Sequence, residues 1–396
     1  MTHLNTWRSK LLFFALVSCA LVTVLFVLQG RTGVNLSDEG YLWYGAQRVA
    51  AGEVPIRDFA SYDPGRYYWT AAFMRLSGNN GIVSLRVAAA VFQAVGLFVA
   101  MIALARLPQR KNSVFWIMAS AVLLLWMFPR HKLFDTTISI SLVAVLAYLA
   151  EQPSAARYFL TGIVVGLAAF FGRNHGVYGA IGSLCLLAYL SAGGGAVRWY
   201  ANFAWWLSGV VAGYCPMLAV LAAAPGFYGA FRDSVRLIIE TKTTNIPLPV
   251  PWPWISFFSE LPLYQSIRGT IIGLLFMGMA AFGVFGIVRA IRARINKTPV
   301  TPLFLGAAFM AVPYAHYAFS RADVGHLPDI HRLHRQRNVF PRRCGASGSW
   351  HFPAAAWNLC FYIRVSGGDP ANPARRRAGG EYSRYASNAS GLAGFP

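Results

Sequence analysis

Long apolar stretches recur from residue 11 to residue 319, and they constrain the fold more than any other feature. A helix that crosses the roughly 30 Å hydrocarbon core of a membrane needs about 20 mostly apolar residues, because it rises about 1.5 Å per residue. The stretches lie at residues 11–28, 82–105, 113–128, 137–150, 159–171, 177–190, 203–224, 269–288 and 302–319. The sequence therefore predicts an all-α polytopic membrane protein with about nine transmembrane helices. The fourth to sixth stretches are short, so re-entrant segments or helices packed inside the bundle are alternatives for them.

The amino-acid composition agrees with a membrane protein. Hydrophobic residues make up 56% of the 396 residues and charged residues 12%, whereas about a quarter of an ordinary soluble domain is charged. The formal charge of +21 comes from Arg and Lys at the ends of the apolar stretches and not from one basic face, so we expect no nucleic-acid partner. The five cysteines show neither metal-binding nor disulfide spacing.

The charges between the apolar stretches predict which loops face the cytoplasm. The first stretch, "LLFFALVSCALVTVLFVL", continues nine residues past Cys19 without a small-residue cleavage site, so we expect a retained anchor rather than a signal peptide. With the N-terminus inside, the basic loops "RLPQRKN" and "RAIRARINKT" face the cytoplasm, as the positive-inside rule expects. Of the eleven Asp and Glu residues before residue 328, only Glu151 then lies inside. This one-sided placement indicates chemistry on the outer face.

The first outer loop, at about residues 29–81, carries the adjacent acids Asp38 and Glu39. Ser37 can serve as an N-cap, and "DEGYLWYGAQRVAAG" then predicts a short helix that ends at Gly52 and lies at the membrane interface, where Tyr and Trp are favoured. Acids in a first helical turn can also simply complement the helix dipole, which contributes about 0.3–1 kcal/mol each. The loop continues as "GEVPIRDFASYDPGRYYW", with a predicted Pro-Gly turn. The charged residues around that turn are Arg57, Asp58, Asp63 and Arg66.

Residues Asp38 to Trp69 resemble the first outer loop of the polytopic C-type glycosyltransferases, most closely the protein O-mannosyltransferase and aminoarabinose-transferase branch. The shared features are the acidic pair after the first span, the short amphipathic helix and the proline-centred turn before Tyr-Tyr-Trp. The resemblance covers about residues 1–327. Relatives often carry two prolines where this chain has "DPGRYYW", so a role for Arg66 follows from its charge alone.

The resemblance implies a membrane glycosyltransferase that moves a sugar from a polyprenyl-phosphate donor to an acceptor hydroxyl. The acceptor would be a glycan, a lipid or a protein, and the protein would contact membrane lipid throughout. We expect it in the bacterial inner membrane, with its site on the periplasmic or outer face.

Transfer of a sugar from a lipid phosphate requires an acid in one outer loop and basic groups in others. The attack needs a carboxylate to take the acceptor's proton, a catalytic role that we assign to the pair Asp38 and Glu39. The lipid phosphate leaves as a stable anion, so cations or a metal must receive its charge. The outer loops "PRHKLFD", "GRNHG" and "HYAFSRADVGHL" supply cations. The predicted substrate-binding residues are Asp63, Arg66, Arg130, Lys132, Arg173, His175 and Arg321.

A metal cofactor and a different function are alternatives. A histidine could hold a divalent metal together with Asp38 or Glu39, although no paired-histidine spacing precedes the tail, and the sequence is compatible with either chemistry. The alternative function is a transporter or flippase for an amphipathic or lipid-linked substrate. Transporters usually keep ionisable groups near the membrane midplane, whereas only Arg86 lies inside a predicted span, close to its start. A purely structural scaffold would leave the outer acids without a purpose.

The chain changes character at about Pro328. The remaining residues contain ten Arg, no Lys and no stretch long enough to span a membrane. We therefore divide the chain into a transmembrane glycosyltransferase-like domain at residues 1–327 and an Arg-rich tail at residues 328–396. The tail is either disordered or the product of an out-of-frame reading of its coding stretch. We favour the second interpretation, under which the domain is truncated, because "FSRADVGHL" is typical of an outer loop that leads to further spans.

Overall fold

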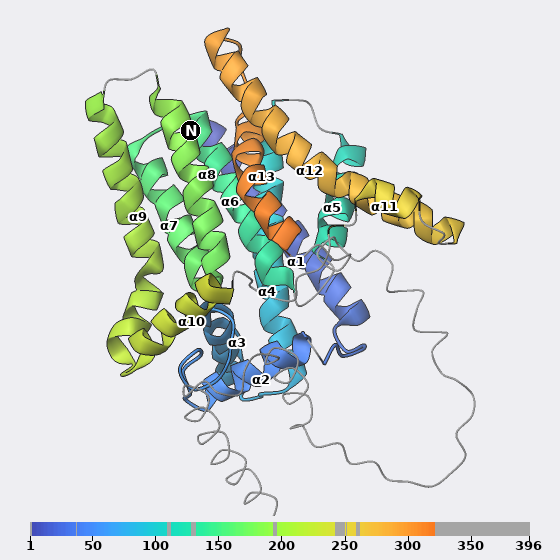
Figure 1. Ribbon diagram of the computed structural model, residues 1–396, viewed down its shortest axis with the longest axis vertical. Coiled ribbons are helices and arrows are strands. Elements are labelled where there is room, and N and C mark those ends of the chain that lie inside the picture. The colour runs from blue at the N-terminus through green and yellow to red at the C-terminus, as the bar shows by residue number, and fades with distance from the viewer. Residues whose placement is uncertain are drawn as a thin grey trace, which may run out of the picture. The chain divides into compact units, whose positions relative to one another are not determined.

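The computed structural model describes residues 2–36, 38–108, 112–127, 132–192, 196–241, 250, 252–258 and 262–320, all within the unit Met1–His334. These residues form helices and no named strand (Figure 1). The helices are α1 (Thr2–Gln29), α2 (Glu39–Ala50), α3 (Pro64–Ser77), α4 (Ile82–Ala105), α5 (Ser113–Trp126), α6 (Leu133–Glu151), α7 (Ala155–Phe171), α8 (Arg173–Ser191), α9 (Ala196–Ala223), α10 (Phe227–Thr241), α11 (Pro253–Phe257), α12 (Leu263–Ile295) and α13 (Pro302–Ser320). The predicted domain boundary near residue 328 and the tail beyond it lie outside the described residues.

Each of the nine predicted apolar stretches coincides with a helix, in agreement with an all-α membrane protein. In the described part of the chain six helices, namely α1, α4, α6, α9, α12 and α13, are long and apolar enough to cross a membrane. The apolar helices α5 and α7 have 14 and 17 residues, and α8 has 19 residues but begins with the polar residues "RNH". The structure thus supports a multi-pass protein, while the count of nine spans stays a prediction.

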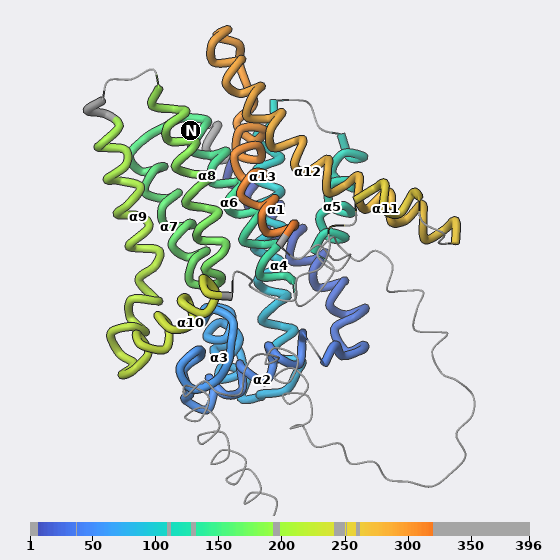
Figure 2. Tube along the Cα trace, in the orientation of Figure 1, coloured from blue at the N-terminus to red at the C-terminus, as the bar shows by residue number. Residues whose placement is uncertain are grey.

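Helix α6 packs against α4, α7, α8 and α13 (Figure 2). Its residues Leu142, Leu146 and Leu149 are completely buried, and they recur at spacings of three and four that place them on one helix face. The candidate site lies at the start of α6, where Asp135 contacts Arg66 near the start of α3 and His175 near the start of α8.

Two pairs of glycines let α7 and α9 approach each other closely. Gly162 and Gly166 in α7, and Gly209 and Gly213 in α9, each form a G-x-x-x-G motif. A Cβ atom added at Gly162 or at Gly213 would lie 2.1 Å from a carbonyl oxygen of the facing helix, which is too close for any side chain. Small residues at this spacing drive helix association where lipid surrounds the helices, because they permit contact between the backbones.

The segment predicted as the first outer loop contains the predicted short helix, α2. Its N-cap residue is Asp38, whereas Ser37, the predicted N-cap, lies outside the described residues. The helix ends at Ala50, and Gly52 follows with a φ of 101°, a left-handed conformation that glycine adopts readily. The apolar residues Leu42 and Val49 face α3 and are buried there.

The predicted Pro-Gly turn is wrong, because Pro64 and Gly65 open α3 instead. Proline suits the first position of a helix, where a backbone N–H has no partner within the helix and its fixed φ is already helical. Asp63 becomes the N-cap residue of α3, and Arg66 lies in its first turn. The Pro-Gly pair is compatible with a turn and with a helix start. In the structure it starts a helix, and Asp63 and Arg66 then contact Arg173 and Asp135.

Two helices that the apolar stretches did not predict, α10 and α11, follow α9. In α10, Phe227 is completely buried while Leu237 and Ile239 are exposed. Helix α10 also carries ion pairs of Arg232 with Asp233 and of Arg236 with Glu240. An amphipathic helix of this kind suits a membrane interface, where one face contacts headgroups and the other contacts apolar surface.

Candidate functional site

The starts of α3 and α8 are joined by one carboxylate. Gly172 separates α7 from α8, so Arg173 is the first residue of α8 rather than part of a loop. The backbone N–H of Arg173 donates to Asp63 Oδ2 at 2.8 Å, and its Nε donates to Asp63 Oδ1 at 2.7 Å. Asp63 thus satisfies an N–H at the α8 N-terminus that has no partner within the helix.

Helix α10 supports the same arginine from another direction. Arg173 Nη1 donates to the Ser234 hydroxyl at 2.9 Å, and its guanidinium lies 5.3 Å from the centre of the Phe231 ring. Contacts from α3 and α10 together hold the guanidinium in one orientation.

Asp135, in the first turn of α6, holds a second set of contacts. Arg66 Nη2 donates to Asp135 Oδ1 at 3.0 Å, and His175 Nε2 lies 2.8 Å from the same oxygen. His175 Nδ1 lies 2.7 Å from the hydroxyl of Tyr314. Because an ionised carboxylate only accepts hydrogen bonds, we assign the imidazole proton to Nε2, which leaves Nδ1 to accept from the tyrosine. The imidazole is 2% exposed and is therefore fixed from both sides.

These residues form one charged cluster, which comprises Asp63, Arg66, Lys132, Asp135, Arg173 and His175. Burial alone would lower the pKa of the Arg66 guanidinium, but the neighbouring Asp135 carboxylate raises that pKa above its ordinary value. Lys132 acts electrostatically on the same carboxylate. Its three cations, Arg66, Lys132 and Arg173, outnumber its two carboxylates, Asp63 and Asp135. A net positive charge in partly buried surroundings attracts an anion.

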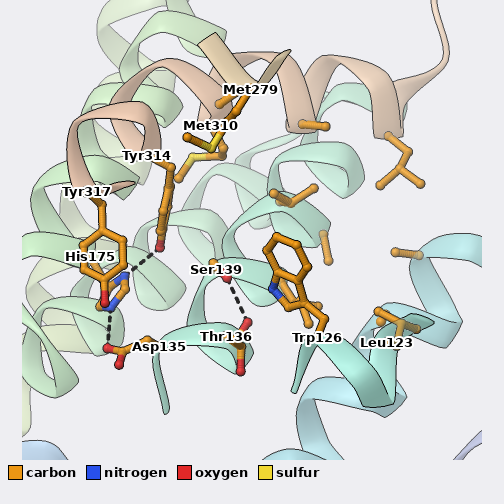
Figure 3. A pocket seen from close by; sticks show the side chains of 18 of the residues that line it. Leu123, Trp126, Asp135, Thr136, Ser139, His175, Met279, Met310, Tyr314 and Tyr317 are labelled. Carbon is orange, nitrogen blue, oxygen red and sulfur yellow. Dashed lines mark hydrogen bonds and ion pairs between the residues drawn. The ribbon is translucent and has the colours of Figure 1, made fainter. Parts of the chain in front are cut away.

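An apolar cavity of about 430 Å³ begins at the charged cluster. Figure 3 shows Tyr314 and Tyr317 beside His175, with Asp135 below it and Trp126 across the cavity. Only a few polar side chains line the wall, and most of the remaining wall is apolar. The polar or charged residues in the wall are Lys132, Asp135, Thr136, Ser139, His175, Tyr314 and Tyr317. The volume is typical of a small-molecule site, and the uneven polarity suits an amphipathic molecule.

Asp38 and Glu39 belong to a second group, at the starts of α2 and α4. Glu39 is 4% exposed and forms two hydrogen bonds with Arg86, at 2.7 Å from Nε to Oε1 and 2.9 Å from Nη2 to Oε2. Arg86 also donates to two backbone carbonyls of the segment after α1. Asp38 is partly exposed, and its carboxylate accepts from the Asn35 side-chain amide at 3.1 Å. Asp38 is therefore the more accessible acid of the pair, and Glu39 fastens α2 to α4.

The structure thus sorts the predicted site residues into three sets. The charged cluster contains Asp63, Arg66, Lys132, Arg173 and His175; the second group contains Asp38 and Glu39; and Arg130 and Arg321 lie outside the described residues.

Sequence reasoning missed Asp135, Tyr314 and Tyr317 as site residues. Asp135 stood in the same outer segment as Lys132, so its loop was identified although its central place was not. Tyr314 and Tyr317 lie three residues apart in a mostly apolar stretch that also contains His316. That spacing predicts one shared helix face and was the available signal for both tyrosines.

The arrangement can hold an anion and an apolar chain of the same molecule at once. Within the described ranges, no group of three His, Cys, Asp or Glu side chains is placed to hold a metal ion.

In comparisons with known proteins, no family model matches this chain, and no curated protein or solved structure is significantly similar to it.

Proposed function

We propose that the protein is a membrane glycosyltransferase that moves a sugar from a polyprenyl-phosphate donor to an acceptor hydroxyl on the outer face. The observation that carries this proposal is the apolar cavity of about 430 Å³ that ends at a charged cluster of net positive charge. A donor of this class combines a long apolar chain with a phosphate. The chain would occupy the apolar part of the cavity, and the phosphate would lie at the cluster.

Lys132 is the residue that we assign to the phosphate. It lines the cavity and acts electrostatically on Asp135, so it places a cation at the charged end of the cavity. As the acceptor oxygen attacks the anomeric carbon, the bond from that carbon to the phosphate oxygen breaks and leaves its electron pair on the phosphate. A cation placed in advance stabilises this developing charge. We propose Asp38, which lies outside the cavity wall, as the base that takes the acceptor's proton. Asp135 and Tyr314 hold the His175 side of the cavity in place.

The test measures sugar transfer in membranes supplied with polyprenyl-phosphate sugars. We expect Lys132→Gln to lower turnover about 10- to 1000-fold, the scale found for loss of one preorganised electrostatic donor. Arg232→Gln is the matched control, because it removes one exposed cation from α10 outside the cavity wall. Equal turnover of Lys132→Gln and the unaltered protein would rule out this role for Lys132.

One observation favours lipid translocation as a second candidate function. A second cavity, of about 330 Å³, shares the lining residues Ala103, Ala144 and Leu303 with the first. The two cavities therefore follow α6 along much of its length. A labelled polyprenyl phosphate that changed leaflets in vesicles containing the protein, without any sugar transfer, would favour translocation over the transferase.

A further inference from the structure

The second cavity lies toward the opposite ends of α4 and α6 from the charged cluster. Its wall contains Arg106, just after α4, and Tyr148 and Glu151, in the last turn of α6. Deeper in, the wall is apolar and includes Val99 and Val164. This cavity, like the first, is polar at one end and apolar along the rest.

Two arginines share one carboxylate at the polar end. Arg106 Nη1 lies 2.5 Å from Glu151 Oε2, and Arg157 Nη1 lies 3.5 Å from the same oxygen. Both guanidiniums also lie against Tyr148, at 4.9 Å for Arg106 and 3.8 Å for Arg157 from the ring centre. Arg106, Arg157 and Glu151 together therefore carry one net positive charge, because one carboxylate faces two guanidiniums.

The position of this group corresponds to the headgroup level of a membrane. Helix α6 has 19 residues and a rise of about 28 Å, close to the roughly 30 Å of a hydrocarbon core. If α6 spans the membrane, Arg106 and Glu151 lie at the leaflet opposite the charged cluster, which the basic loops predict to be the cytoplasmic one. The cavity extends from Glu151 to Ser141, about 15 Å along α6, and so reaches into the hydrocarbon region.

We infer that this second cavity binds an anionic membrane lipid. Its phosphate contacts Arg106, Arg157 adds a second positive charge near Glu151 and Tyr148, and the first part of a hydrocarbon chain lies against Val99 and Val164. Basic pockets between membrane helices on the cytoplasmic side are suited to anionic headgroups, because that leaflet is rich in them. The apolar wall distinguishes a lipid from a free phosphate ion, which would leave this surface uncovered. The inference is independent of the proposed glycosyltransferase activity.

The experiment uses the full chain in phosphatidylcholine vesicles that contain a small share of phosphatidylglycerol. After gentle extraction into neutral detergent, the lipid that stays with the protein is quantified by mass spectrometry. We expect enrichment of phosphatidylglycerol, and a loss of that enrichment of about 5- to 10-fold in Arg106→Gln. Arg106→Lys, which keeps the charge, should retain most of it. An excess of inorganic phosphate should not displace the lipid.

Two further variants separate the cavity from general charge and from misfolding. Arg292→Gln removes one exposed cation from the last turn of α12, outside the cavity wall, and should leave the enrichment unchanged. Val99→Trp fills the cavity without changing charge and should abolish enrichment, while gel filtration and thermal unfolding check that each variant is folded. Equal losses in Arg106→Gln and Arg292→Gln, full enrichment in folded Val99→Trp, or displacement by inorganic phosphate would each overturn the inference.

Discussion

At the scale of single residues, the buried ion pair between Glu39 and Arg86 shows how a charge inside a predicted span is accommodated. The two side chains are 5% and 3% exposed, and Arg86 directs its remaining donors to backbone carbonyls. Taking both charges out of water is costly, so the pair contributes little net stability. Removing one partner is a different matter, because it leaves the other charge buried without compensation.

The first prediction follows from that asymmetry. Glu39→Gln should destabilise the protein by about 3–5 kcal/mol, measured by thermal or denaturant unfolding in detergent. The double variant Glu39→Gln with Arg86→Met should lose less stability than the two single variants added together. Each single variant leaves one buried charge without its partner, whereas the double variant removes both charges. Additive losses would show that the two side chains do not act as a pair.

The second prediction concerns Asp38. If Asp38 takes the acceptor's proton, Asp38→Asn should lower sugar transfer at least about 100-fold, because the amide keeps the size of the side chain and loses its basicity. Stability should change by less than about 1 kcal/mol, as for one charge at a helix start. Asp58→Asn, at an exposed acid paired with Arg57, is the control and should leave transfer unchanged. Normal transfer by Asp38→Asn would move the base elsewhere, with Asp135 the next acid to test.

The sequence could indicate which residue types belong to the site, but it could not show how they pair. Arg173, His175 and Lys132 were identified because charges in short segments between apolar stretches are costly unless they have a use. Their partners are distant in sequence: Arg173 and Asp63 are 110 positions apart, and His175 and Asp135 are 40 apart. Such contacts arise from helix packing, which local patterns do not encode. The predicted catalytic pair accordingly separates into a buried acid, Glu39, and an accessible acid, Asp38.

At the scale of helices, packing between α7 and α9 depends on glycines, which have no side chain, rather than on apolar side chains. Continuous apolar stretches at residues 159–171 and 203–224 predicted both helices, although the first of them is short for a span. It could not predict their contact, since every side of a helix in lipid is apolar. The two G-x-x-x-G motifs were the available signal for that contact. Short helices such as α10 were missed because their charged faces interrupt apolar stretches.

The third prediction tests this contact. A Cβ at Gly166 would lie 2.3 Å from the carbonyl oxygen of Val210, so Gly166→Leu must push α7 and α9 apart. We expect destabilisation of about 1–3 kcal/mol or more, measured by thermal unfolding in detergent. Gly278→Leu in α12 is the matched control, because nothing lies within 4 Å of a Cβ at that position. The control should be neutral or slightly stabilising, since leucine favours helix more than glycine does. Equal effects at the two glycines would contradict close packing as the reason for the motif.

At the scale of the whole molecule, the two charged groups at the ends of α6 are related by the thickness of a membrane. The charged cluster includes Lys132 and Asp135 at the start of α6, and Glu151 ends that helix about 28 Å away. Acidic and basic residues pair at both ends, while residues 136–150 of the helix between them carry no charge. Such a chain has one stable depth in a membrane, because moving either end inward would bury charge in hydrocarbon. Which end faces the cytoplasm follows from the basic loops, and not from the packing.

The last prediction tests that orientation in intact cells. The five native cysteines are first replaced by serine, and single cysteines are then placed at Asp58, in the segment between α2 and α3, and at Asn296, just after α12. Both positions are exposed, so each thiol should be reachable from its own side of the membrane. A membrane-impermeant maleimide should label Asp58→Cys directly and Asn296→Cys only after the membrane is permeabilised, because the basic segment around Asn296 is held inside. Labelling of Asn296→Cys in intact cells would reverse the orientation. It would also place the charged cluster on the cytoplasmic face and remove the basis for acceptors on the outer side.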